Sequence, residues 1–110
     1  MQTNFGKAII LATLAMTLVV LSNGTAMAQD GKALYEAKLC NSCHGPEGKA
    51  PVMPMYPKLA GQNAAYLEQQ VKDIRDKKRT NGQATTMQAL VATVTDAENK
   101  AISAYLATVK

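Results

Sequence analysis

Histidine occurs once in the 110-residue sequence, cysteine twice and tryptophan not at all. A single histidine, His44, excludes any site that needs two imidazole ligands. The two cysteines, Cys40 and Cys43, lie three positions apart, so a disulfide between them would constrain the unfolded chain little. A chain this small has a marginal core unless something reinforces it. Either the fold is barely stable, therefore, or a large apolar cofactor completes the core.

A long hydrophobic run is also missing. The longest uncharged apolar stretch, residues 8–21, is shorter than the ~20 residues that a membrane-spanning helix needs. Lys7 precedes this stretch, and Ala26 and Ala28 stand at the −3 and −1 positions of a cleavage site, which is the pattern of a secretory signal peptide. We predict a signal peptide over residues 1–28 and one mature domain over residues 29–110. A leader that is retained as a membrane anchor is the alternative.

The basic residues do not form a nucleic-acid-binding stripe. The formal net charge is only +4, and aromatic residues are not interleaved with the lysines and arginines. The one basic cluster is Lys77, Lys78 and Arg79, and we interpret it as favourable charge at the end of a helix. No nucleic-acid partner is predicted.

No segment shows the alternation of a β-strand, so the sequence predicts an all-α fold with three main helices. The first is expected over residues 30–41 with Asp30 as its N-cap, and the second over residues 63–78 with Asn63 as its cap. The last begins at Thr95, with Glu98 at the spacing of a capping box. Residues 45–61 hold all four prolines and are expected to form an irregular loop, and a polar loop is expected before Met87. Loops this long suit a chain that wraps around a cofactor.

The motif that carries chemistry is Cys40-Asn41-Ser42-Cys43-His44, the C-x-x-C-H pattern of covalent c-type haem attachment. The two thiols can add to the two vinyl groups of one haem, and the next residue can then present its imidazole to the iron. A thioredoxin-like pair would need a βαβ context. Zinc needs four ligands, and because there is no third cysteine or second histidine it would have to recruit carboxylates. A plain disulfide would leave His44 unexplained.

The single histidine rules out bis-histidine ligation, and the predicted mature chain has three methionines as candidates for the sixth iron ligand. Met53 and Met55 follow His44 closely, in the proline-rich loop, whereas Met87 follows a complete helix and can approach from the opposite face. A Met/His iron has the raised potential of an electron carrier. We therefore predict Met87 as the ligand, with Met53 and Met55 as filler. Pro57 is a candidate to accept a hydrogen bond from the other ring nitrogen of His44.

From residue 30 to the end, the chain resembles the class I c-type cytochromes. It is most similar to the small bacterial periplasmic ones that carry one haem, and to one half of the tandem di-haem cytochromes. The matching features are Gly31 with Tyr35, residues 40–44, residues 56–62, Met87, and Ile102 with Tyr105.

The resemblance implies the class I cytochrome c fold, with long loops around one covalently attached haem c. It implies that the first and last helices cross closely through Gly31, Tyr35, Ile102 and Tyr105. It also implies that the carbonyl of Pro57 holds His44 and that Met87 is the distal ligand. Because tryptophan is absent, we expect the haem to pack against aliphatic residues, Tyr56 or Tyr66.

The function that the resemblance implies is electron carriage in the periplasm, by a protein that is not an enzyme. The expected partners are redox proteins, donors and acceptors, that dock transiently on a monomer with no stable membrane span after cleavage of the leader. Four lysines are candidates for the docking rim: Lys32, Lys38, Lys49 and Lys58. Two alternatives stay open, namely a haem enzyme or sensor with a labile distal site, and a haem subunit dedicated to one larger oxidoreductase.

Overall fold

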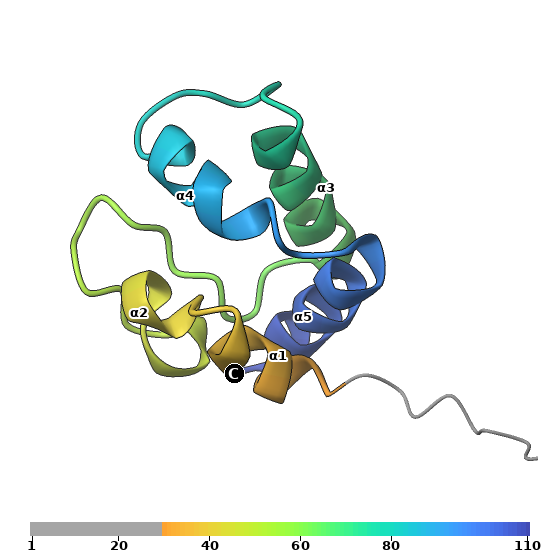
Figure 1. The fold of residues 1–110 in the computed structure, drawn as a ribbon. Coiled ribbons are helices and arrows are strands. Elements are labelled where there is room, and N and C mark those ends of the chain that lie inside the picture. Colours follow the sequence, from red (N-terminus) through yellow and green to blue (C-terminus); the bar gives the residue numbers. More distant parts are fainter. Residues whose placement is uncertain (1–29) are drawn as a thin grey trace, which may run out of the picture.

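The computed structural model describes residues 30–110, and within that range the chain is helical without strands, as expected (Figure 1). The predicted signal peptide, residues 1–28, lies outside the described residues. The elements, in chain order, are α1 (Gly31–Ala37), α2 (Asn41–His44), a short 3-10 helix η1 (Pro46–Gly48), α3 (Ala64–Arg75), α4 (Ala84–Val91) and α5 (Asp96–Thr108). None of these helices is long and apolar enough to cross a membrane. Residues 30–110 thus contain five α-helices, two more than the three main helices expected.

The first predicted helix, residues 30–41, is wrong at its C-terminal end. Asp30 does cap α1, and its carboxylate accepts hydrogen bonds from the backbone N–H groups of residues 32 and 33. The helix then ends at Ala37, because Leu39 takes a left-handed conformation with φ of 62°. The N–H of Leu39 bonds the carbonyl of Glu36, and the N–H of Cys40 bonds that of Tyr35. This is a Schellman motif, which normally places glycine where Leu39 stands.

The caps predicted for the two long helices are confirmed. Asn63 accepts a hydrogen bond from the N–H of Tyr66 at 3.1 Å and starts α3. Thr95 and Glu98 form a capping box at the start of α5, each side chain bonding the other's backbone N–H. Helix α3 ends at Arg75 instead of residue 78.

The polar loop predicted before Met87 is partly helical. Helix α4 begins at Ala84 and carries Met87 in its middle. Its start has no side-chain cap, which is why the sequence did not reveal it. Packing against α3 holds it instead, through a buried cluster of Ile74, Ala84 and Val91.

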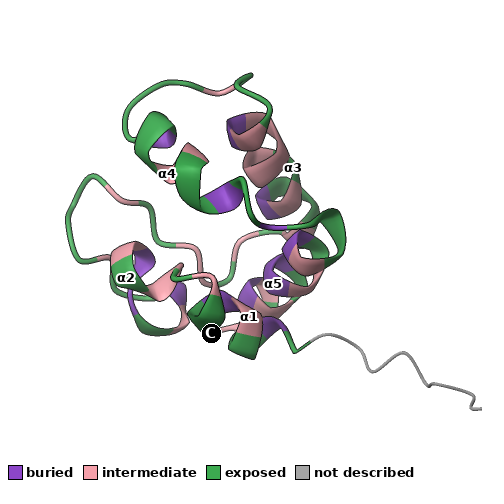
Figure 2. Cartoon of the chain, viewed as in Figure 1, coloured by how far each residue is buried: buried purple, intermediate pink, exposed green. Residues whose placement is uncertain are grey.

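The main core lies where α1 and α3 pack on α5, and Figure 2 shows buried residues on all three helices. Its members are Tyr35, Leu67, Val94, Ile102 and Leu106. Gly31 sits at the crossing of α1 and α5, where a Cβ atom would overlap the backbone oxygen of Ala101 and approach Cβ of Tyr105 to 2.6 Å. The rings of Tyr35 and Tyr105 are 6.2 Å apart. The close crossing that the family resemblance implied is therefore present.

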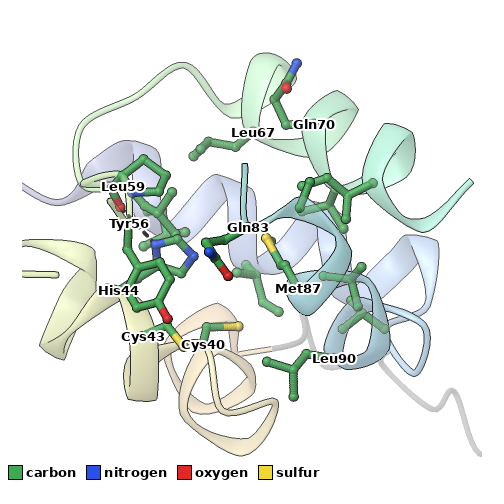
Figure 3. A pocket seen from close by; sticks show the side chains of 18 of the residues that line it. Cys40, Cys43, His44, Tyr56, Leu59, Leu67, Gln70, Gln83, Met87 and Leu90 are labelled. Carbon is green, nitrogen blue, oxygen red and sulfur yellow. Dashed lines mark hydrogen bonds between the residues drawn. The ribbon is translucent and has the colours of Figure 1, made fainter. Parts of the chain in front are cut away.

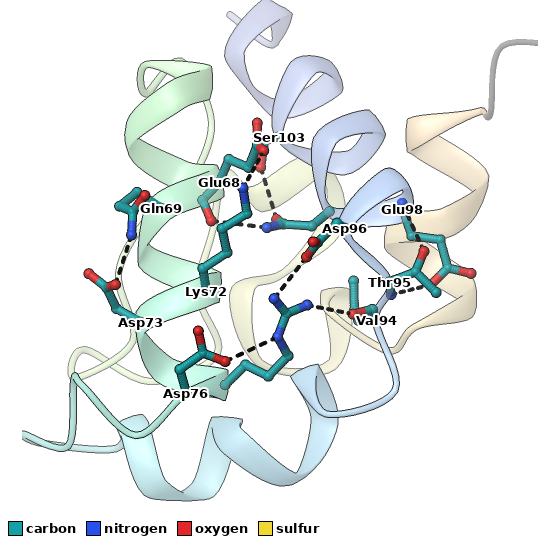
Figure 4. A network of polar contacts seen from close by, with 12 residues as sticks. Glu68, Gln69, Lys72, Asp73, Asp76, Val94, Thr95, Asp96, Glu98 and Ser103 are labelled. Carbon is teal, nitrogen blue, oxygen red and sulfur yellow. Dashed lines mark hydrogen bonds and ion pairs between the residues drawn. The ribbon is translucent and has the colours of Figure 1, made fainter.

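Polar contacts lock α3 against the start of α5 (Figure 4). The guanidinium of Arg75 donates to the carboxylate of Asp96 at 2.8 Å and to the carbonyl of Val94 at 3.2 Å. The buried amide of Asn99 donates to the carbonyl of Glu68 at 2.9 Å. These contacts fix the two helices that form the back of the cavity described next.

Candidate functional site

A cavity of about 320 Å³, within the size range of small-molecule and cofactor sites, opens between α2 and α4 (Figure 3). Side chains from all five α-helices and from the loop before α3 line it. Most of this lining is apolar, and it includes Leu59, Leu67, Val71, Ile74, Leu90 and Ile102. The cavity reaches both hydrophobic clusters of the core, so a large apolar ligand here would complete the core.

The two cysteines lie along one side of this cavity. The Schellman motif at the end of α1 brings Cys40 back against Tyr35, and the single turn of α2 then presents Cys43 and His44. Both cysteines are free thiols, and Figure 3 draws both sulfurs at the lower edge of the cavity. Burial raises the pKa of Cys40 to about 11. A raised pKa keeps the Cys40 thiol protonated, so this thiol is not activated as a nucleophile.

His44 is buried and faces the cavity with one ring nitrogen held from behind. Its Nδ1 lies 2.8 Å from the carbonyl oxygen of Pro57. A carbonyl can only accept, so Nδ1 carries the proton and Nε2 keeps its lone pair. Burial lowers the pKa of His44, which favours the neutral imidazole. The structure thus contains the contact with Pro57 that the spacing and the resemblance suggested.

Met87 lines the cavity on the side opposite His44. Figure 3 shows its sulfur directed from α4 into the space between the two residues. Met87 is half-buried and packs on the cluster around Ile74. Met55 also reaches the cavity but is 57% exposed, and Met53 is 44% exposed and does not line the cavity. Of the three candidates, Met87 alone is held in place by a packed helix.

Of the remaining predicted residues, the two tyrosines and one of the four lysines line the cavity. Tyr56 and Tyr66 both line the cavity, and the ring of Tyr56 lies 6.4 Å from that of His44. Lys38 is not a free rim charge, because its Nζ is 3.2 Å from both Glu98 and the carbonyl of Thr93. The three other candidate lysines, Lys32, Lys49 and Lys58, are exposed.

These features fit a haem and do not fit zinc. In residues 30–110 no three side chains of histidine, cysteine, aspartate or glutamate come together. A haem, by contrast, is a flat apolar group that needs two thiols at one edge and an iron ligand on each face. The cavity supplies an apolar slot, the thiols of Cys40 and Cys43 along one side, an oriented imidazole, and a thioether across from it.

Comparison with known proteins agrees with this geometry. The family model for cytochrome c matches residues 28–110. The chain belongs to the cytochrome c family. As a family member it has the class I fold and binds haem c covalently, as the sequence predicted.

Two relatives and one solved structure illustrate the likeness. Cytochrome c4 of Pseudomonas aeruginosa is 39% identical over 101 residues, which are 92% of this chain and 46% of that protein. A thiosulfate dehydrogenase electron acceptor of Stutzerimonas stutzeri is 32% identical over 100 residues, 84% of this chain and 45% of that protein. The crystal structure of reduced cytochrome c4 from Pseudomonas stutzeri superposes with a TM-score of 0.65 at 31% identity, covering 76% of this chain and 48% of that one. The chain therefore spans about half the length of these relatives.

Sequence reasoning missed one group of cavity residues. Gln70, Arg79, Asn81 and Gln83 line the cavity, the first from α3 and the other three from the segment that joins α3 to α4. The polar sequence of residues 79–83, just before the ligand candidate Met87, could have indicated that this segment lines the cavity. Polar residues at that place are equally typical of a solvated loop, however.

Proposed function

We propose that the protein is a periplasmic electron carrier in which Cys40 and Cys43 hold one haem c, and His44 and Met87 bind its iron from opposite faces. The observation that supports this most strongly is the placement of His44 and Met87 across one apolar cavity. A haem iron with His/Met ligation supplies a reversible one-electron couple at raised potential.

The residues around the proposed iron site are suited to keeping the two iron ligands in fixed positions. Nδ1 of His44 is fixed by Pro57, so the imidazole keeps one tautomer and one orientation. Met87 is held by a helix that packs on α3. With both faces occupied there is no position for a substrate, and this favours electron transfer over catalysis.

The rim of the cavity supports transient docking of redox proteins. Two apolar side chains that line the cavity, Leu39 and Met55, are more than half exposed. Small, weakly held interfaces of this kind are typical of electron-transfer partners. The name of the Stutzerimonas relative, an electron acceptor for a dehydrogenase, supports a redox enzyme as one partner class. The predicted leader over residues 1–28 supports the periplasm as the compartment.

The experiment that tests this function is a potentiometric titration of Met87→Ala beside the wild type. The variant keeps the cysteines and His44, so we expect covalent haem to remain. Loss of the thioether should lower the reduction potential and let the ferrous iron bind added carbon monoxide, which the wild type should exclude.

Met55→Ala is the matched control, because Met55 lines the same cavity from an exposed loop. Its potential should stay near that of the wild type. If Met55→Ala lost potential and Met87→Ala behaved as wild type, the ligand assignment would be overturned. If the wild type itself bound carbon monoxide readily, the alternative of a labile distal site would replace the carrier.

A further inference from the structure

One of the polar residues in the cavity lining, Arg79, carries a positive charge. Arg79 is half-buried and donates from Nη1 to the amide oxygen of Gln70 at 2.9 Å, while its Nε lies 3.4 Å from Oδ1 of Asn81. All three residues line the cavity together with Gln83, in a lining that is otherwise mostly apolar.

The backbone explains why Arg79 points here and not into solvent. Helix α3 ends in a second Schellman motif, in which Lys77 has φ of 61° and the N–H of Lys78 bonds the carbonyl of Asp73 at 2.8 Å. The N–H of Arg79 bonds the same carbonyl at 3.0 Å, so the chain turns back over the last turn of α3. Lys77 and Lys78 stay exposed, whereas Arg79 returns to Gln70. Arg79 therefore differs from the other two members of this basic cluster, because its side chain packs back on α3.

Within residues 30–110, the guanidinium of Arg79 forms no ion pair with a carboxylate. The ion pairs within residues 30–110 involve other side chains, and none of the described cavity-lining residues is an aspartate or glutamate. Its partners are neutral amide oxygens. A positive charge that is partly removed from water is stabilised when an anion binds to it. The planar guanidinium of arginine matches the geometry of a carboxylate. Arg79 thus offers a binding position for a carboxylate in the cavity.

We infer that Arg79, steadied by Gln70 and Asn81, binds a propionate carboxylate of the haem. This rests on the haem site proposed above. The propionates of haem lie on the edge of the ring opposite the two vinyl groups. The cysteines lie along one edge of the cavity (Figure 3), and Figure 1 shows the segment that joins α3 to α4 at the end of the fold away from α1 and α2. The arginine therefore sits where the carboxylate edge belongs.

Two consequences follow from this position. A positive charge beside the haem favours the reduced iron, so Arg79 raises the reduction potential. The segment that carries Arg79 also leads directly into α4, which begins at Ala84 and carries Met87. Arg79 is thus a positioning residue, which ties the start of α4 to the cofactor.

The test compares Arg79→Gln with Lys78→Gln in the isolated holoprotein. Each variant loses one positive charge, but Lys78 is exposed and does not line the cavity. Resonance Raman spectroscopy reads the propionate bending band, which responds to hydrogen bonds at the carboxylate. We expect Arg79→Gln to shift this band and to lower the potential by clearly more than Lys78→Gln, whose band should match the wild type.

Arg79→Lys keeps the charge but loses the fork, so it should shift the band while retaining most of the potential. It also replaces Arg79→Gln if that variant fails to mature. An unshifted propionate band in either Arg79 variant overturns the inference. If Arg79 instead binds a carboxylate of a docking protein, the band of the isolated protein will also stay unshifted, because no partner is present. A wild-type chain without covalent haem would instead refute the haem site itself, so the two failures are distinguishable by mass.

Discussion

Gly31→Ala is a substitution for which helix propensity and tertiary packing predict opposite signs. Alanine in place of glycine within a helix stabilises by up to about 1 kcal/mol. At Gly31, however, the new Cβ would overlap the backbone oxygen of Ala101 and come within 2.6 Å of Cβ of Tyr105. Neither atom can move by a change of rotamer, so helices α1 and α5 would have to separate.

Overpacking of this kind costs about 1–3 kcal/mol. We take the upper value because the obstacle is backbone, and subtracting the propensity gain leaves a net loss of about 2 kcal/mol. For a domain of this size each kcal/mol lowers the melting temperature by about 4–8 °C, so a drop of roughly 8–16 °C is expected.

The assay is thermal unfolding of the holoprotein followed by circular dichroism. Ala33→Ser, on the exposed side of the same helix, is the control and should stay within about 0.5 kcal/mol of the wild type. A Gly31→Ala protein as stable as the wild type, or more stable, would refute the close crossing of α1 and α5.

Two further predictions concern side-chain hydrogen bonds. The buried hydroxyl of Tyr35 donates to the carbonyl of Gly45 at 2.6 Å, so Tyr35→Phe should lower the free energy of unfolding by about 1–2 kcal/mol in guanidinium titrations; an unchanged midpoint would show that this bond does not contribute. The carboxylate of Glu98 accepts from the N–H of Thr95 and pairs with Lys38, and these contacts hold its pKa below the ordinary 4.5. A lowered folded-state pKa stabilises the protein above pH 4.5, and that contribution is lost as the pH falls further. The difference in stability between wild type and Glu98→Gln should therefore shrink below pH 4.5, and a difference that stays constant from pH 7 to pH 3 would contradict the assigned contacts.

Local signals could be predicted from the sequence because their physics is local. Asp30, Asn63 and Thr95 each cap the helix that follows them, since a side-chain oxygen two or three residues before a free N–H needs no tertiary information. The haem motif belongs to the same class, because its five residues share one turn.

Tertiary packing decides the features that were missed. Leu39 adopts a left-handed conformation at a cost of about 1–2 kcal/mol, and nothing in its identity announces that. Helix α4 lacks an N-cap side chain and is held by the cluster around Ile74. The side chain of Arg79 is directed by the Schellman motif before it, which depends on a left-handed lysine instead of the usual glycine.

The sequence predicted which residues form the site better than it predicted how they are arranged in space. The motif and the single histidine pointed to Cys40, Cys43 and His44, and composition left only methionines for the opposite face. The choice of Met87 rested on chain length and resemblance. Its position on a packed helix across from His44 is a tertiary feature that the sequence pattern does not contain.

The most direct test of the central claim is the intact mass of the mature chain, produced with a c-type maturation system and measured after denaturation. Covalent attachment predicts that the wild type carries one haem-sized addition that survives denaturation, and that the double variant Cys40→Ala/Cys43→Ala carries none. A wild-type chain at the bare polypeptide mass would contradict the assignment of these two cysteines as the haem attachment site.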